Sequence, residues 1–218
     1  MKNAVSVFLL LVLVLIVGGC AHDETKIRSA QELYQEATEL AEKGKVEKAV
    51  EKFMEVRTYY PGHELARKAL LATADLHYDE EDYASALQSY EEFRLLYPTD
   101  FEAGYSLYRI AMAHFNQIAT LDRDQTETVR SIQTFENFLL SFPDSPHAED
   151  AKTRLAEAKS VLAKHYVYIG KFYLKKKEYG AACRRFQYVR EHYPNVSLDD
   201  DLDELISRSC KITEQANQ

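Results

Sequence analysis

The stretch ACRRFQYVREHYP, residues 182–194, contains the pattern that decides the fold. A small residue is followed four positions later by an aromatic residue, and the segment closes on an aromatic residue and proline. Three further segments repeat this pattern, and the proline lies twelve positions after the small residue in every copy. The four sets are Ala49, Phe53 and Tyr60-Pro61; Ala86, Tyr90 and Tyr97-Pro98; Ser131, Phe135 and Phe142-Pro143; Ala182, Phe186 and Tyr193-Pro194. Four copies at one spacing indicate an internal repeat.

A second small residue lies twelve positions before the first in three copies, as Ala37, Ala74 and Gly170. In the third copy Ala111 lies twenty positions before Ser131, so eight residues are inserted there, within 118–126. The chain between Pro143 and Gly170 is also 14 residues longer than its counterpart in the preceding copy, which is about four helical turns. This extra length predicts one long helix over residues 147–176.

Each repeat is expected to be a pair of amphipathic helices. Apolar residues follow helical spacing, as at Ala49, Phe53 and Val56. The small residues would let the two helices approach closely, and the proline would end the second helix. One hairpin cannot bury its apolar stripe alone, so successive hairpins are expected to stack into a superhelix.

These marks resemble the tetratricopeptide repeat. The resemblance implies an all-α superhelix of four helix hairpins plus a C-terminal capping helix, within a domain of residues 30–218. The repeats would span about 30–61, 67–98, 104–143 and 147–194, and the capping helix 199–216.

The N-terminal residues predict export and a lipid anchor. Lys2 precedes an apolar run of 14 residues from Ala4 to Val17, too short for a membrane span and suited to a signal peptide. The junction Gly18-Gly19-Cys20 resembles a bacterial lipoprotein processing site. That resemblance implies removal of residues 1–19, an S-diacylglycerol and an N-acyl group on Cys20, and a lipidated linker over residues 20–29. The alternative is an ordinary signal peptide or an uncleaved anchor, with Cys20 incidental.

The composition argues against several classes of function. The net charge is −8, and no cluster of Lys and Arg is dense enough to follow nucleic acid. The seven His residues are scattered, and neither a zinc pattern nor a phosphate-binding loop is present. The series Asp122, Asp124, Thr126 and Thr128 lacks the glycine and closing glutamate of a calcium loop, which favours helix capping. We expect no cofactor other than the lipid, no metal, no nucleic-acid partner and no catalysis.

Two further cysteines, Cys183 and Cys210, lie on predicted neighbouring helices. In an oxidising compartment they can form a disulfide. The alternative is a pair of buried thiols that pack as small apolar groups.

In the tetratricopeptide family the first helix of each repeat lines the concave face. This resemblance places six candidates for binding a peptide in the groove: Tyr34, Tyr78, Tyr105, Tyr108, Met112 and Phe115. It places Lys164, Lys171 and Lys175 on the same face of the fourth repeat. Tyrosine combines a large apolar area with a polar tip, which suits aromatic-bearing peptides. The alternative is that some of these rings pack between repeats.

The order of parts is similar to the BamD family, the lipoproteins of the outer-membrane β-barrel assembly machinery. The similarity rests on the lipidation site, the Tyr-Pro repeat ends, the Asp122-Arg123-Asp124 insertion, and the segments 142–148, 154–156 and 162–166. The chain departs from well-known members by ending one helix after the fourth repeat, where they carry a full fifth repeat.

The resemblance implies a protein tethered by lipid to the inner leaflet of the outer membrane, on the periplasmic side. Its N-terminal repeats would bind unfolded barrel precursors, and its C-terminal repeats would dock a POTRA domain of the barrel subunit, with Arg185 as a contact. A periplasmic scaffold for envelope constriction in cell division or for pilus secretin assembly is the alternative. A hydrolase is the rival from another class, and it would require a catalytic cluster that the sequence lacks.

Overall fold

A computed structural model describes residues 28–216 of the chain, and their side chains as far as residue 212. Within this range the regular structure is entirely α-helical, which confirms the predicted fold class. The helices are α2 (Ala30–Glu42), α3 (Val46–Tyr59), α4 (Glu64–Asp79), α5 (Tyr83–Leu96), α6 (Ala103–Asn116), α7 (Thr126–Ser141), α8 (Ala148–Lys175), α9 (Tyr179–His192) and α10 (Leu202–Ala216).

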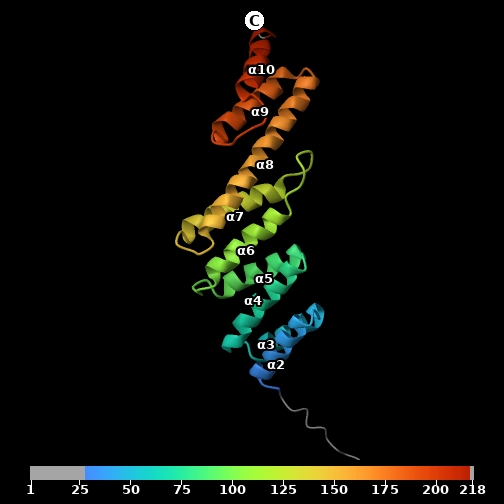
Figure 1. Ribbon diagram of the computed structural model, residues 1–218, viewed down its shortest axis with the longest axis vertical. Coiled ribbons are helices and arrows are strands. Elements are labelled where there is room, and N and C mark those ends of the chain that lie inside the picture. Colours follow the sequence, from blue (N-terminus) through green and yellow to red (C-terminus); the bar gives the residue numbers. More distant parts are fainter. Residues whose placement is uncertain (1–27, 217–218) are drawn as a thin grey trace, which may run out of the picture.

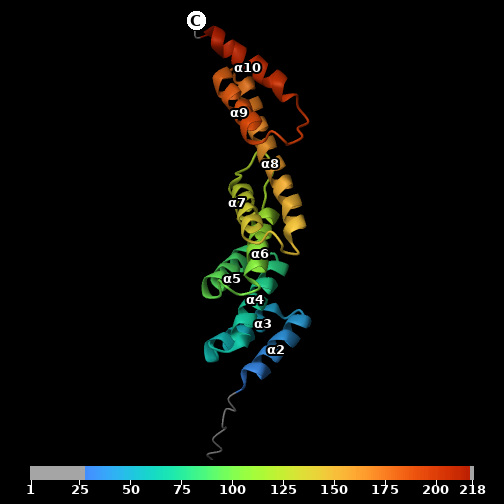
Figure 2. The ribbon, with the colours of Figure 1, turned by 90° about the vertical axis from the view of Figure 1, so that its left-hand side faces the viewer.

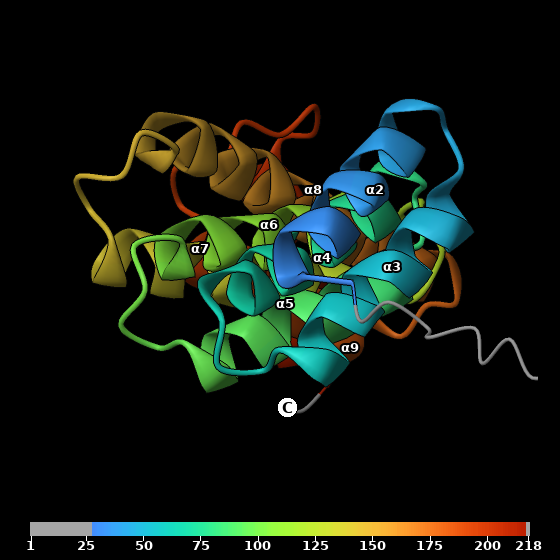
Figure 3. The same ribbon diagram turned by 90° about the horizontal axis from the view of Figure 1, so that it is seen from below.

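The helices pair in chain order, and the pairs stack along one long axis from α2 to α10 (Figure 1). Four hairpins form in this way: α2 packs on α3, α4 on α5, α6 on α7, and α8 on α9. The second helix of each of the first three hairpins also packs on the first helix of the next hairpin, and α9 packs on α10. The view turned by 90° shows the same order (Figure 2). From the N-terminal end, α3 lies on one side of the axis and α7 on the other, so the described hairpins wind as a tetratricopeptide superhelix (Figure 3).

The core of each hairpin is the contact that the repeat pattern predicts. In the fourth hairpin Gly170 of α8 faces Phe186 of α9, and a Cβ built on Gly170 would lie 2.4 Å from the Cε1 atom of that ring. In all four hairpins, both small residues and the aromatic residue between the helices are buried. The close approach in the fourth hairpin therefore depends on the missing side chain of Gly170, whereas the other three hairpins accommodate the single methyl group of Ala37, Ala74 or Ala111.

The four aromatic-proline pairs form the same turn. The aromatic residue leaves the helix with φ between −130° and −135° in every copy. Its carbonyl accepts a hydrogen bond from the N–H three residues later, as His63 donates to Tyr60 at 2.9 Å and Ser145 to Phe142 at 3.1 Å. Proline suits the second position of such a turn because its φ is already fixed there. The turn aims the chain into the next hairpin.

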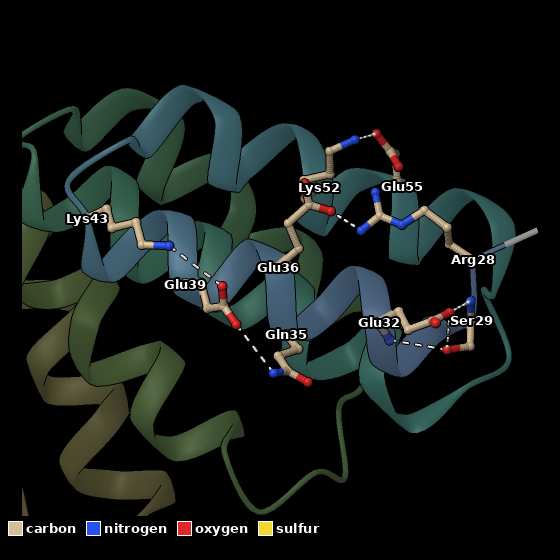
Figure 4. A network of polar contacts seen from close by, with 9 residues as sticks. All are labelled: Arg28, Ser29, Glu32, Gln35, Glu36, Glu39, Lys43, Lys52 and Glu55. Carbon is tan, nitrogen blue, oxygen red and sulfur yellow. Dashed lines mark hydrogen bonds and ion pairs between the residues drawn. The ribbon is translucent and has the colours of Figure 1, made fainter. Parts of the chain in front are cut away.

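The first hairpin begins at a capping box. The Ser29 hydroxyl accepts from the Glu32 N–H at 3.2 Å, and the Glu32 carboxylate accepts from the Ser29 N–H at 2.8 Å. Around this start, ion pairs join Arg28 to Glu36 and Lys52 to Glu55 on the surface of the hairpin (Figure 4). The start of α2 is thus fixed by local hydrogen bonds.

Helix boundaries differ from the predicted repeat limits at two points. α4 begins at Glu64, ahead of the predicted repeat start at 67, because the His63 Nδ1 atom accepts from the Leu65 N–H at 3.1 Å and caps the helix. The C-terminal helix begins at Leu202 and not at 199, because the Asp201 carboxylate accepts from the Glu204 N–H at 3.0 Å. The predicted long helix is confirmed as α8, whose first half packs on α7 and whose second half packs on α9.

α10 closes the stack. Ile206 is buried against Phe186 and Val189 of α9. Of the two alternatives for the cysteines, the structure contains the disulfide, which joins Cys183 of α9 to Cys210 of α10 with 5.1 Å between their Cα atoms. Between residues 28 and 216, no helix combines the length and the apolar character that a membrane crossing requires. The predicted signal peptide and Cys20 lie outside the described residues.

The substitution Gly170→Ala tests the close approach of α8 and α9. In an open helix this change stabilises by up to about 1 kcal/mol, because alanine is the better helix former. Here the added methyl group would overlap the Phe186 ring, so we expect a loss of roughly 1–3 kcal/mol in the free energy of unfolding. Urea denaturation followed by circular dichroism measures it.

The control is Gly62→Ala, because a Cβ at Gly62 would meet no atom within 4 Å. We expect this variant to unfold within about 0.5 kcal/mol of the wild type. Equal stability of the two variants would show that the crossing tolerates a methyl group.

Candidate partner-binding surface

All six residues expected in the groove lie on the first helices of the first three hairpins, and all six are half-buried. Tyr34 lies on α2, Tyr78 on α4, and the other four on α6. Tyr34 packs edge-on against Phe53, with 5.2 Å between ring centroids. The other candidates take part in contacts between hairpins, which decides how they can serve a partner.

A carboxylate on α4 joins the second hairpin to the third. The Asp75 Oδ1 atom accepts hydrogen bonds from the Tyr90 hydroxyl at 2.5 Å and from the Tyr105 hydroxyl at 2.8 Å. Tyr90 lies on α5 and is fully buried, whereas Tyr105 lies on α6. One oxygen atom therefore connects three helices of two successive hairpins.

Arg109 of α6 completes this junction. Its Nε atom donates to the Tyr90 hydroxyl at 3.0 Å, and its Nη2 atom donates to Asp79 at 3.1 Å. The guanidinium lies 3.5 Å from the centre of the Tyr78 ring, a close cation–π contact. The position of the half-buried Tyr78 ring is thus set by an arginine of the next hairpin.

The third and fourth hairpins meet in a similar way. The Tyr108 hydroxyl donates to Asp150 of α8 at 2.6 Å, and the Tyr108 ring stacks on His147 with 4.4 Å between centroids. Met112 and Phe115 pack partly buried against the cluster around Phe135.

These contacts define what the aromatic residues offer to a partner. The hydroxyl tips of Tyr105 and Tyr108 are used between hairpins, so their rings are held in fixed positions and present only part of their apolar surface. Beside them, the loops before α6 and α8 enclose a cleft of about 500 Å³, lined in part by Phe101, Tyr105, Phe142 and His147. A rigid aromatic surface with an adjacent cleft is suited to apolar side chains of a peptide.

The electrostatics of the Asp75 junction follow from burial. Burial raises the pKa of Asp75 above its usual value, although the bonds from Tyr90 and Tyr105 and the charge of Arg109 act in the opposite direction. Burial and the neighbouring Asp75 charge raise the pKa of Tyr105. At the end of α9 in the fourth hairpin, burial and the neighbouring Tyr188 and Tyr166 raise the pKa of Tyr193 to about 12. Both tyrosines are protonated at neutral pH, and the Tyr105 hydroxyl can therefore donate to Asp75.

The insertion before α7 is an ordered loop that docks on α8. Its buried residue is Gln125, whose amide donates to the Thr120 carbonyl at 3.0 Å and whose Oε1 atom accepts from Thr128 at 2.7 Å. The His165 Nδ1 atom of α8 lies 2.7 Å from the Leu121 carbonyl oxygen. The sequence pointed to Asp122 and Asp124 and missed Gln125, because nothing in its spacing marks a buried amide.

The two aspartates of the insertion act as local acceptors. The Asp122 carboxylate accepts from the Thr120 hydroxyl at 2.7 Å, and Asp124 accepts from the Thr126 N–H at 2.9 Å at the start of α7. These bonds lower the pKa of both aspartates. No group of three or more His, Cys, Asp or Glu residues in the described chain is arranged to hold a metal ion.

The fourth hairpin carries the basic candidates. Lys164 lies 3.6 Å from Asp199, and Lys171 pairs with Asp200, so two of the three lysines face the acidic segment before α10. Lys175 is exposed. Arg185 is exposed on α9, and its guanidinium lies 5.7 Å from the centre of the Tyr166 ring. Arg185 is therefore accessible to a partner.

The substitutions Asp75→Ala and Asp75→Asn test the junction between the second and third hairpins. Alanine removes the acceptor shared by two tyrosine hydroxyls, so we expect a loss of roughly 1–3 kcal/mol in the free energy of unfolding. Asparagine keeps an Oδ1 acceptor and should retain most of that stability. Urea denaturation of both variants measures the difference.

The pH dependence of the same comparison has a definite sign. Because the pKa of Asp75 is raised in the folded chain, its ionisation favours the unfolded state. The wild type should therefore lose stability relative to Asp75→Asn as the pH rises from about 3 to about 7. A difference that is constant with pH, or one of opposite sign, would contradict the raised pKa.

Comparison with known proteins gives a family match over the whole described part of the chain. The family model described as "YfiO: Outer membrane lipoprotein" matches residues 27–217. A tetratricopeptide repeat protein from Parabacteroides merdae superposes with a TM-score of 0.44 at 17% identity, over 85% of this chain and 72% of that one.

Several relatives carry the name "Outer membrane protein assembly factor BamD", among them a protein of Rickettsia prowazekii and one of Caulobacter vibrioides. The protein of Rickettsia prowazekii is 31% identical over 187 residues, which cover 84% of this chain and 74% of that protein. The protein of Caulobacter vibrioides is 30% identical over 187 residues, which cover 83% of this chain and 61% of that protein. The chain thus spans less than two thirds of the Caulobacter protein. With the family model matched over residues 27–217 and these two relatives, the chain belongs to the YfiO family of outer membrane lipoproteins, the family of BamD.

Proposed function

We propose that the chain is a non-enzymatic scaffold of outer-membrane β-barrel assembly, tethered by lipid on Cys20 to the periplasmic face of the outer membrane. The observation that carries this proposal is that the family match covers the complete stack of hairpins, from α2 to α10. The relatives named as assembly factors align with 83% and 84% of the chain. The scaffold acts by holding two partners close together beside the membrane.

The first three hairpins receive unfolded barrel precursors. The half-buried rings of Tyr78, Tyr105 and Tyr108 are fixed by contacts between hairpins, so a peptide that binds them does not have to order them. The cleft beside Tyr105 has room for an apolar side chain. Tyr34, Met112 and Phe115 extend the same series along α2 and α6. Aromatic residues of an extended precursor segment are the ligands that such a surface fits best.

The fourth hairpin docks the POTRA-bearing barrel subunit. Arg185 is exposed on α9, where its guanidinium stays beside the Tyr166 ring and is oriented by it. An arginine held in this way can donate two parallel hydrogen bonds to a carboxylate of the partner. The disulfide between Cys183 and Cys210 fixes α10 to the helix that presents Arg185.

The substitution Cys20→Ser tests the lipid anchor. Several acyl chains hold a protein stably at a bilayer, so their loss should release the protein from membrane fractions into the soluble fraction. Labelled palmitate should no longer be incorporated. The matched control is the pair Cys183→Ser and Cys210→Ser, which retains Cys20 and should remain in the membrane pellet and labelled. Unchanged membrane partition of Cys20→Ser would contradict the anchor.

The substitution Arg185→Glu tests docking of the barrel subunit. We expect recovery of the co-purified barrel subunit from detergent-solubilised envelopes to fall roughly tenfold or more, because a charge-assisted hydrogen bond becomes a repulsion. Arg184→Glu is the matched control, since Arg184 is also exposed and adjacent on α9. The helicity of both variants should equal that of the wild type. Equal losses in the two variants would indicate a general charge effect and remove the specific role of Arg185.

A further inference from the structure

The second half of α8 carries a surface that neither the precursor groove nor the Arg185 contact uses. Tyr168 and Phe172, one helical turn apart, are 46% and 49% exposed. Several large apolar side chains are exposed within residues 28–212, and among them only Tyr168 and Phe172 belong to the first helix of a hairpin. The remaining exposed apolar side chains lie on second helices or in a loop. Two adjacent aromatic rings left half in water are typical of an interaction site.

Lysines frame these two rings. Lys164, Lys171 and Lys175 lie four, three and seven residues from Tyr168, which places them on the same face of the helix as that ring. Lys176 adds a cation–π contact, with its Nζ atom 5.7 Å from the centre of the Phe172 ring. Residues 164–192 carry eight Lys and Arg against two Glu, in a chain whose net charge is −8. The local charge is therefore opposite to that of the protein as a whole.

The chain itself shows what kind of segment this surface accepts. The loop between α9 and α10 lays Leu198, Asp199 and Asp200 along one edge of the surface. Asp200 pairs with Lys171, and Asp199 lies 3.6 Å from Lys164. Leu198 packs partly buried against the cluster that contains Val167. A pocket of about 150 Å³ remains between this loop, Tyr168 and the insertion residue Leu121.

The two ion pairs are held weakly. The Asp199 side chain is 91% exposed, and those of Lys164, Lys171 and Asp200 are 38%, 44% and 34% exposed. Exposed pairs of this kind contribute about 0–1 kcal/mol each. The cap of α10 depends on Asp201, whose carboxylate accepts from the Glu204 N–H, so Asp199 and Asp200 can be displaced without removing that cap. Residues 198–200 therefore cover one edge of the α8 surface through contacts that a partner segment can replace.

We propose that Lys164, Tyr168, Lys171, Phe172 and Lys175 form a second docking surface, which binds an acidic extended peptide segment of a partner protein. The segment has the chemistry of the chain's own Leu198-Asp199-Asp200: an apolar side chain beside Tyr168 and carboxylates on Lys164 and Lys171. Binding displaces residues 198–200 from the edge, so these residues weaken the affinity for the partner. Arg185 belongs to α9 and contacts the ring of Tyr166 on α8, and neither residue is one of the five that form this surface.

The probe is a fluorescent synthetic peptide with the sequence of residues 195–202, added to the full-length protein in detergent. Fluorescence anisotropy gives its Kd for the wild type and for Asp199→Asn combined with Asp200→Asn. We expect the double variant to bind the probe roughly three- to tenfold more tightly, because two competing ion pairs are lost. Asp199→Asn alone should show a smaller change in the same direction, and its 91% exposed side chain makes a folding defect an inadequate explanation.

Two further variants locate the site. In the Asp199→Asn, Asp200→Asn background, Lys171→Glu should weaken probe binding at least tenfold, as should Tyr168→Ser combined with Phe172→Ser. Lys152→Glu is the matched control, because Lys152 lies on the same helix and is exposed outside the surface. Circular dichroism verifies that each variant keeps the helicity of the wild type.

Four outcomes would overturn the proposal. The first is equal affinity of the wild type and the double variant for the probe, and the second is equal binding of a probe whose aspartates are replaced by asparagine. The third is an equal effect of Lys152→Glu and Lys171→Glu on probe binding. The fourth is lysine-dependent binding to phosphatidylglycerol vesicles without binding to the probe. The last would identify the basic face as a lipid contact. Neither membrane release of Cys20→Ser nor loss of the barrel subunit in Arg185→Glu bears on these measurements.

Discussion

The close contact between a small residue on the first helix and an aromatic ring on the second is the constraint on which the rest of the structure depends. At Gly170 the ring of Phe186 occupies the space that a side chain would fill. The small residue and the aromatic ring fix how the two helices of a hairpin cross. The aromatic-proline turn at the end of the second helix therefore has the same backbone geometry in every hairpin. Four equal turns then produce one continuous superhelix, and the surfaces for partners follow from it.

Apolar packing holds each hairpin together and continues across the joints, whereas polar contacts between hairpins add direction to those joints. Asp75 and Arg109 fix the second hairpin on the third, and Tyr108 with Asp150 fixes the third on the fourth. Hydrogen bonds are directional, so these joints define the angle between neighbours more narrowly than apolar contacts would. The same tyrosines belong to the candidate peptide-binding surface and are half-buried. The architecture of the groove and its aromatic lining are therefore coupled through shared side chains.

The two ends of the stack differ in charge and in the way they are closed. The first hairpin starts at a capping box at Ser29, while the last is closed by α10 and the disulfide at Cys210. Basic residues concentrate on α8 and α9, where they meet the acidic segment before α10. In the proposed function, this chemical difference between the two ends would let each end select a different partner.

The sequence alone determined the all-helical class, the four hairpins and the long α8, because close helix crossings require small residues at fixed intervals that are visible in one dimension. It also supplied the family resemblance that the comparisons confirm. Only the tertiary structure decided that Tyr105 bonds to Asp75, that Gln125 is buried in the insertion, and that Asp199 and Asp200 face Lys164 and Lys171. These contacts join residues 29 to 35 positions apart, or depend on how a loop closes, and their geometry follows from the angle at which hairpins stack. No local spacing encodes that angle.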